Sequence, residues 1–252
     1  MESLFKSALI PQMMFSMYLS STTEVTDSDS TIIFGGSDLH AYSSLNQTNK
    51  IAVTDTGFWS VHMPAVSVHS QLLNVTAKFA IIDSGTSLMV VCEADYSNLV
   101  SSLVQGLEDC RQPVGGSLDC SCTNSSDFPT ITLTLGGYDF DISPEHYIQE
   151  GGSEGNCRCF LLIQPSSFHL QEGQSAWILG DVFMRGYYME FDMEERTVGI
   201  AGGRVSSYNP PGSGFKVWVI VVSISFAVST VILIFKCRKS SAPATNYTPL
   251  PQ

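Results

Sequence analysis

A run of 19 uncharged residues, from Val217 to Phe235, places the strongest constraint on how this chain can fold. At a helical rise of about 1.5 Å per residue, the run just covers a hydrocarbon core of about 30 Å. Lys236, Arg238 and Lys239 follow it directly, and basic residues at one end of a membrane helix favour the cytosolic side. The pattern predicts a single transmembrane helix, with the preceding residues outside the cytosol.

This helix divides the chain into four predicted parts. They are a folded domain at 1–203, a juxtamembrane stalk rich in Pro, Gly and Ser at 204–216, the transmembrane helix at 217–235 and a cytosolic tail at 236–252. The topology is that of a single-pass type I membrane protein. Tyr247-Thr248-Pro249-Leu250 in the tail resembles a tyrosine-based sorting signal, so we expect an endosome-like or lysosome-like compartment or the cell surface.

The cysteines and glycosylation sequons point to an oxidising compartment. Six of the seven cysteines precede the apolar run, and an even set on one side of a membrane suggests disulfides. The three sequons begin at Asn46, Asn74 and Asn124, on the same side. A lumenal or extracellular domain is therefore expected. Zinc binding by the Cys-x-Cys pairs that begin at 120 and 157 is the alternative.

The charge balance limits the kind of partner and cofactor. The chain has 24 acidic and 12 basic residues, a formal net charge of -12. Binding to nucleic acid requires clustered Lys and Arg, so we expect no nucleic-acid partner. The histidines show no metal-ligand spacing and no phosphate-binding loop occurs, so neither a metal nor a cofactor is expected.

Short apolar runs bounded by turn residues predict an all-β domain. The predicted strands are 15–19, 31–34, 58–61, 65–68, 78–82, 130–135, 177–179, 187–191 and 197–201. Only residues 93–107 have a helical period, and a second helical turn is expected at 143–147. The apolar face of the longer helix comprises Tyr96, Leu99, Val100, Leu103 and Val104.

Asp83 is the residue best placed for chemistry, because it ends the apolar strand that contains Ile81 and Ile82. A strand end holds a carboxylate in a fixed place. Gly85 permits a tight turn, and the nearby hydroxyl side chains can hydrogen-bond within the loop. An Asp-Ser-Gly triplet alone is more often an ordinary turn than a catalytic motif, so the residues around it must distinguish the two.

Those surroundings resemble the pepsin-like aspartic proteases, peptidase family A1. Asp83-Ser84-Gly85-Thr86-Ser87 is similar to the family's second active-site motif, and Trp177–Phe183 is similar to the strand that passes through the active-site loop. Further matching blocks, in the family's order, are 15–19, 34–36, 58–59, 184–188, 191–192 and 198–201. The chain therefore resembles the C-terminal lobe of the bilobal pepsin-like fold, all-β with a few short helices.

The resemblance implies an aspartic endopeptidase that acts on peptide or protein substrates. In this family each lobe supplies one aspartate, and the two carboxylates activate a water molecule. Asp83 would be the C-lobe member, supported by the loop residues Ser84 and Gly85. Thr86 would join the hydrogen bonds between the lobes, and Asp181 would lie near the loop and tune its pKa.

The resemblance also implies a disulfide in the stretch where family members have one in this lobe. The candidates are Cys122 with either Cys157 or Cys159. Six cysteines allow 15 pairings, so the remaining partners stay unassigned.

The second aspartate of such a dyad is not apparent in the chain. Asp55-Thr56-Gly57 comes nearest, but Phe58 follows it where the motif has a hydroxyl residue. Residues 1–20 also lack the pattern of a secretory signal. We expect a fragment of a longer protease, inactive without its N-terminal lobe. The alternatives are a catalytically inactive, membrane-tethered binding lobe and a homodimer that pairs two Asp83 loops.

Overall fold

The computed structural model describes residues 1–20, 30–54, 57–112, 117–153, 156–170 and 173–208. The chain divides into two units, Met1–Gly214 and Phe215–Gln252. The second unit lies outside the described residues, and so does the predicted membrane helix at 217–235. Within the described ranges, no helix is both long enough and apolar enough to cross a membrane.

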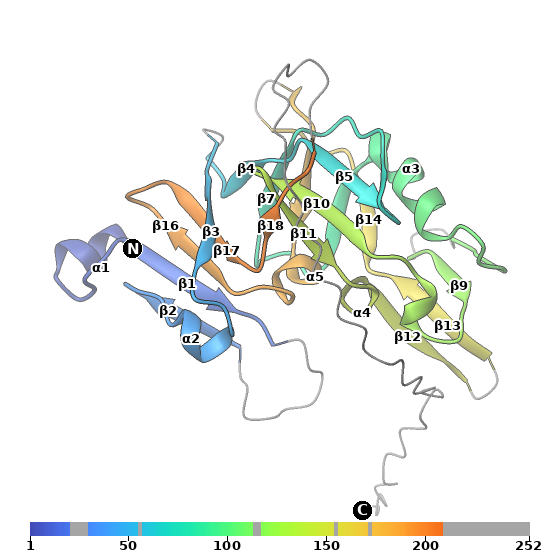
Figure 1. The fold of residues 1–252 in the computed structure, drawn as a ribbon, viewed down its shortest axis with the longest axis horizontal. Helices are drawn as coiled ribbons and strands as arrows, with labels where there is room; N and C mark the ends of the chain where they lie inside the picture. The colour runs from blue at the N-terminus through green and yellow to red at the C-terminus, as the bar shows by residue number, and fades with distance from the viewer. Residues whose placement is uncertain (21–29, 55–56, 113–116, 154–155, 171–172, 209–252) are drawn as a thin grey trace, which may run out of the picture. The chain divides into compact units, whose positions relative to one another are not determined.

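Strands dominate the described part of the chain and form four sheets (Figure 1). The first sheet has the order β2 (Thr31–Phe34), β1 (Met14–Tyr18), β16 (Met189–Asp192), β17 (Thr197–Ala201) and β3 (Thr48–Ala52). The second has the order β18 (Arg204–Val205), β11 (Tyr138–Ile142), β10 (Ile131–Leu135), β5 (Ala65–Val68) and β6 (Gln71–Leu72). The third has three strands, β12 (Ile148–Ser153), β13 (Asn156–Leu161) and β9 (Asp119–Ser121).

The fourth sheet carries the candidate site. Its order is β14 (Ile163–Ser166), β8 (Met89–Cys92), β15 (Ala176–Leu179), β7 (Phe79–Ile82) and β4 (Ser60–His62). β15 pairs in parallel with β7 and antiparallel with β8. The loop that joins β7 to β8 therefore crosses the end of β15.

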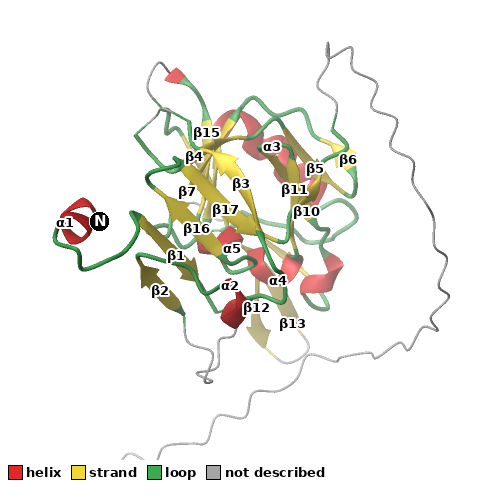
Figure 2. Cartoon of the chain, turned by 60° about the vertical axis from the view of Figure 1, so that its left-hand side comes forward, coloured by secondary structure: helices red, strands yellow, loops and turns green. Residues whose placement is uncertain are grey.

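Helices occupy little of the described chain (Figure 2). They are α1 (Glu2–Lys6), α2 (Leu39–Tyr42), α3 (Glu93–Leu103), α4 (Pro144–Tyr147), α5 (Asp181–Met184) and the 3₁₀ turn η1 (Ser125–Asp127). α3 packs against β5, β8 and β14. Four of its five predicted apolar residues are buried, as is Asp95, which the pattern did not predict. The helix ends at Leu103, four residues before the predicted end.

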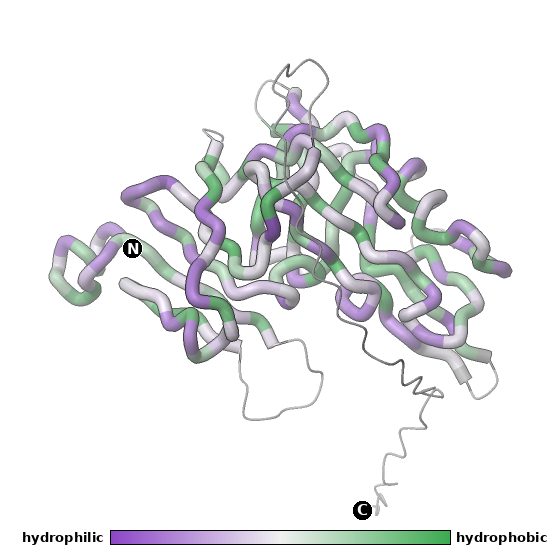
Figure 3. Tube along the Cα trace, in the orientation of Figure 1, coloured by the Kyte–Doolittle hydropathy of each residue, from purple (hydrophilic) through white to green (hydrophobic). Residues whose placement is uncertain are grey.

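The core is built by alternation along the strands. In β16, Met189 and Phe191 are buried whereas Glu190 is not, and polar and apolar segments alternate along the chain trace in Figure 3. The largest fully buried side chains include Trp177 and Phe140. The predicted mostly β class with few short helices is confirmed.

The folded unit reaches slightly beyond the predicted boundary at residue 203. β18 pairs with β11 through Arg204 and Val205, and Ser206 N donates to Gly137 O at 2.9 Å. These residues belong to the stretch that the composition assigned to a stalk.

Candidate active site

Asp83 lies directly after β7, at the end that β7 shares with β15. Asp83 N donates to Leu179 O at 3.1 Å, and Ile82 N donates to Trp59 O at 2.9 Å. β15 on one side and the residue just before β4 on the other therefore hold the backbone that enters the loop. The loop turns at once, with Thr86 N donating to Asp83 O at 3.3 Å.

Both oxygens of the half-buried Asp83 carboxylate accept a hydrogen bond from the same loop. Gly85 N donates to Oδ1 at 2.9 Å, and Thr86 Oγ1 donates to Oδ2 at 2.6 Å. Donors on two different oxygens fix the plane of a carboxylate as well as its position. Ser84, by contrast, is exposed. The structure thus presents an oriented carboxylate at a strand end.

Gly180 is the residue that lets β15 pass through this loop. A Cβ atom there would lie 1.9 Å from Thr86 O and 2.4 Å from Leu88 O, so no side chain fits. Asp181 N donates to Thr86 O at 2.8 Å and ties the strand end to the loop. The sequence showed Gly180 within a matching block, but only the packing reveals why the position needs glycine.

Asp181 contacts the loop through its backbone. Its carboxylate turns toward Arg185, with Oδ2 3.6 Å from Arg185 Nη2. This ion pair joins the first residue of α5 to the C-cap residue that follows it and is partly exposed. The supporting role suggested for Asp181 at the Asp83 loop stays a prediction.

A pocket with a volume of about 700 Å³ opens beside Asp83. Its walls are mainly apolar and include Trp59 and the rings of Phe58 and Phe168, whose centroids lie 6.1 Å apart in an edge-to-face arrangement. Arg196 also lines the pocket. An open apolar pocket with a few polar groups is the usual form of a ligand site.

The same pocket is lined by Val53, Thr54 and Gly57. The chain on both sides of Asp55 and Thr56 therefore reaches this pocket, whereas these two residues lie outside the described part. The expectation that Asp55 is not catalytic stays a prediction.

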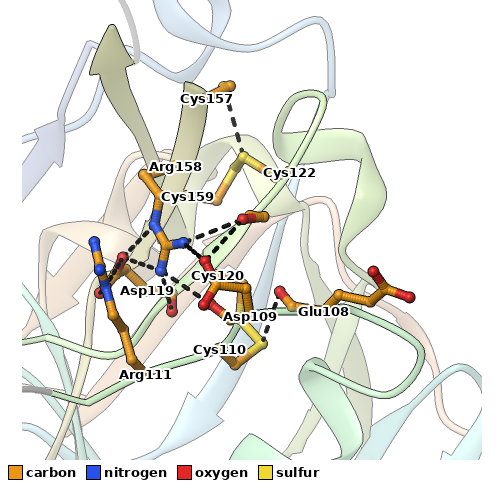
Figure 4. A network of polar contacts seen from close by, with 11 residues as sticks. Glu108, Asp109, Cys110, Arg111, Asp119, Cys120, Cys122, Cys157, Arg158 and Cys159 are labelled. Carbon is orange, nitrogen blue, oxygen red and sulfur yellow. Dashed lines mark hydrogen bonds and ion pairs between the residues drawn. A yellow bond between two sulfur atoms is a disulfide. The ribbon is translucent and has the colours of Figure 1, made fainter. Parts of the chain in front are cut away.

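The cysteines form two disulfides in the described structure, Cys110–Cys120 and Cys122–Cys159 (Figure 4). The second joins Cys122 to one of its two predicted partners. The other candidate, Cys157, belongs to neither disulfide, although its sulfur lies 3.6 Å from that of Cys122. Oxidised sulfurs do not bind zinc as thiolates, so the disulfide interpretation replaces the zinc alternative.

The three sequon asparagines occupy different surroundings. Asn46 and Asn74 are exposed, whereas Asn124 is partly exposed. Asn124 Oδ1 accepts a hydrogen bond from Ser126 N at 2.9 Å and caps η1. Glycosylation at these positions stays a prediction.

Comparison with known families covers the part of the chain that contains Asp83. A model of the family described as eukaryotic aspartyl protease matches residues 1–202. The chain belongs to this family. The match includes β7, the Asp83 loop, β15 and Gly180.

Several mammalian members of the eukaryotic aspartyl protease family are similar to this chain. Gastricsin from Mus musculus is 32% identical over 205 residues, which cover 80% of this chain and 49% of the gastricsin. Pepsin A from Sus scrofa is 28% identical over 201 residues, which cover 79% of this chain and 48% of the pepsin. The chain spans about half the length of the relatives it matches.

Proposed function

We propose that this chain is the C-terminal lobe of a membrane-anchored aspartic endopeptidase, with Asp83 as one of two catalytic carboxylates. The observation that carries this proposal is the Asp83 carboxylate, held by Gly85 N and Thr86 Oγ1 beside an apolar pocket. Membership of the aspartyl protease family supports the reaction class. The coverage of about half of each relative supports a second lobe that supplies the other aspartate.

The proposed reaction needs two carboxylates that share a proton. The ionised member removes a proton from a water molecule, and the protonated member donates a hydrogen bond to the scissile carbonyl oxygen. Because two nearby carboxylates cannot both ionise easily, the pair titrates as a unit and favours activity in acid. In this reaction Gly85 and Thr86 would hold the Asp83 carboxylate in place through their hydrogen bonds to its two oxygens.

The structure suggests which loop hydroxyl faces the second lobe. Thr86 gives its single hydroxyl proton to Asp83, whereas the exposed Ser84 is available to an incoming loop. We therefore propose that Ser84, and not Thr86 as the resemblance implied, contacts the second active-site loop, and that Thr86 supports the carboxylate locally.

Peptide or protein chains with an apolar side chain near the cleaved bond are the proposed substrates. The apolar wall formed by Phe58, Trp59 and Phe168 beside Asp83 supports this assignment. Phe58 is 48% exposed, so a substrate side chain that covers it would gain apolar contact.

The proposed location is a lumenal or extracellular domain of a type I membrane protein. The two disulfides support an oxidising compartment. The apolar run 217–235 and the basic residues that follow it support the anchor. Sequons at Asn46, Asn74 and Asn124 are proposed glycan sites on the same side.

The decisive experiment compares the natural full-length product with the 252-residue chain. Cleavage of quenched fluorescent peptides with apolar residues at the scissile bond is measured from acid to neutral pH. We expect acid activity from the full-length product, its loss in Asp83→Asn, and unchanged activity in the matched variant Asp55→Asn. Full activity in Asp83→Asn would overturn the assignment.

The same assay separates the alternatives. An inactive binding lobe predicts that the natural full-length product binds peptides without cleaving them. A homodimer that pairs two Asp83 loops predicts cleavage by the 252-residue chain alone, together with a dimer in sedimentation. The C-terminal lobe assignment predicts no cleavage by the isolated chain.

A further inference from the structure

We propose that Cys122, Cys157 and Cys159 form an internal thiol–disulfide exchange site, in which the Cys122 sulfur bonds to either of the other two. The site lies on the three-stranded sheet and is separate from Asp83 and its pocket. Figure 4 shows the three sulfurs beside one another, with Arg158 between the two cysteines of β13.

The distances place a thiol against a disulfide. Cys122 is bonded to Cys159, and the Cys157 sulfur lies 3.6 Å from the Cys122 sulfur. Thiol–disulfide exchange begins when a thiolate approaches one sulfur of a disulfide, and the attacked sulfur here is that of Cys122. The attacking group is therefore already in contact with its target.

The register of the strands shows that both pairings fit the same backbone. Cys159 pairs with Cys120 and Arg158 pairs with Ser121, so one step further Cys157 lies opposite Cys122. The hydrogen bond from Cys122 N to Cys157 O, 3.3 Å long, agrees with this position. Directly opposed residues in antiparallel strands have Cα atoms about 4.5–5.5 Å apart, within the range that disulfides span.

Alternation along β13 brings the two competing sulfurs to one face. Residues two apart on a strand point the same way, so Cys157 and Cys159 both face Cys122. Arg158 points the other way and is 4% exposed. Its Nη2 donates to Asp109 O at 3.0 Å and to Asp119 O at 3.2 Å, which holds β13 against β9. Exchange therefore needs side-chain rotation rather than movement of the strand.

The chemical step is balanced within the chain. Cys157 loses its proton to solvent, and its thiolate attacks the Cys122 sulfur. A Cys157–Cys122 bond forms while the Cys122–Cys159 bond breaks, and Cys159 leaves as a thiolate that takes up a proton. No electrons enter or leave, so neither an oxidant nor a reductant is required.

Exchange changes which thiol a reagent can reach. Cys157 is half-buried, whereas Cys159 is fully buried. In the pairing that the structure shows, the unbonded thiol is that of the more accessible Cys157. In the exchanged pairing, the unbonded thiol is that of the buried Cys159. Cys92 provides an internal reference, because it is buried and donates to Asp95 Oδ2 at 3.1 Å. Both forms keep the sheet covalently attached to Cys122.

Disulfide mapping of the full chain tests the proposal directly. The protein is held at about pH 8, where thiolates form, then denatured in acid with excess N-ethylmaleimide and digested with trypsin. Trypsin cleaves after Arg111, Arg158 and Arg185, so Cys122 and Cys157 lie together in peptide 112–158 and Cys159 lies in peptide 159–185. We expect two forms of peptide 112–158: one linked to peptide 159–185 and alkylated at Cys157, and one closed internally by a Cys122–Cys157 bond, with peptide 159–185 alkylated at Cys159. Prior alkylation of the native protein should leave only the Cys122–Cys159 peptide.

Two variants make the test decisive. Cys157→Ser should yield the Cys122–Cys159 peptide alone. Cys159→Ser should form Cys122–Cys157 and lose native alkylation at Cys157, with Cys92 reacting only after denaturation in every sample. A single Cys122–Cys159 linkage in the untreated protein would overturn the proposal, whether or not Cys159→Ser folds. Two separate thiols at Cys122 and Cys157 in a folded Cys159→Ser protein would overturn it as well.

Discussion

Thr86 Oγ1 donates its proton to Asp83 Oδ2 across 2.6 Å, within a single loop. Gly85 N supplies the matching bond to Oδ1 at 2.9 Å. The orientation of the carboxylate is therefore set by this chain alone, before any second lobe is added. A mutation that removes one of these two hydrogen bonds therefore changes how the Asp83 carboxylate is oriented without changing the aspartate proposed for the second lobe.

Replacing Thr86 by Val should lower the kcat of the complete protease by about 100-fold, because a small displacement of a reacting group has an effect of this order. Val has nearly the shape of Thr but no hydroxyl, so KM should change little. Thr86→Ser keeps the hydroxyl and should retain most of the activity. Steady-state kinetics on one peptide substrate measures all three proteins. Equal kcat for Thr86→Val and the natural protein would show that the bond has no catalytic effect.

A methyl group at Gly180 should disrupt the crossing of β15 through the loop. The added Cβ would meet Thr86 O at 1.9 Å and Leu88 O at 2.4 Å. Backbone atoms cannot move aside as a flexible side chain can, so we expect Gly180→Ala to lower the free energy of unfolding by about 3 kcal/mol.

Gly36 supplies the matched control for this prediction. A Cβ at Gly36 has no neighbour within 4 Å, so Gly36→Ala should change the free energy of unfolding by at most about 0.5 kcal/mol. Urea unfolding monitored by tryptophan fluorescence measures both variants. Equal stability of the two variants would show that the loop accommodates a side chain at Gly180.

Regular apolar patterns allowed parts of the fold to be predicted. The strands at 31–34, 65–68 and 197–201 begin and end where the apolar runs do. The position of Asp83 was also predictable, because an apolar strand, an Asp and a Gly follow one another. In each case the signal is local in the sequence.

The strands of the three-stranded sheet were missed because their stability does not come from a local apolar pattern. β12 (Ile148–Ser153) and β13 (Asn156–Leu161) contain Gly, Glu, Arg and Cys. They are held by pairing with each other and with β9, by the Cys122–Cys159 disulfide and by the contacts of Arg158. Such long-range partners cannot be identified from composition.

We therefore expect Arg158 to stabilise the three-stranded sheet. It is almost fully buried and forms an ion pair with the buried Asp119 and another with Asp109. Removing one partner of a buried pair leaves an uncompensated charge, so Arg158→Met should lower the thermal midpoint markedly. Lys50→Met breaks an exposed pair with Glu195 and should change the midpoint little. Differential scanning calorimetry measures the thermal midpoints of both variants. Equal midpoints for Arg158→Met and Lys50→Met would contradict a stabilising role of Arg158.

Asp95 is a buried carboxylate that no local pattern revealed. It accepts hydrogen bonds from Thr76 N at 2.5 Å, Ala77 N at 3.1 Å, Cys92 Sγ at 3.1 Å and Trp177 Nε1 at 3.0 Å. Asp95 lies in α3, and these partners come from β8, from β15 and from the segment before β7. Asp95 thus joins the helix to the two strands that position the active-site loop.

The pKa of Asp95 is lower than that of an ordinary aspartate. Burial acts to raise this pKa, but the hydrogen bonds from Thr76, Cys92, Ala77 and Trp177 outweigh burial and lower it. An unfolded aspartate has a pKa of about 3.9. Because the folded value is lower, the ionised side chain contributes stability above the unfolded pKa. That contribution is lost as the pH falls through the folded pKa.

Asp95→Asn should therefore lower the free energy of unfolding by about 3 kcal/mol near neutral pH, because an amide cannot accept all of these bonds. The difference from the natural protein should persist down to about pH 5 and then narrow below about pH 4. Glu93→Gln, an exposed change in the first turn of α3, should have an effect of about 0.5 kcal/mol. Urea unfolding at several pH values measures these differences. A deficit in Asp95→Asn that stays constant through the acid range would contradict an ionised Asp95 in the folded protein.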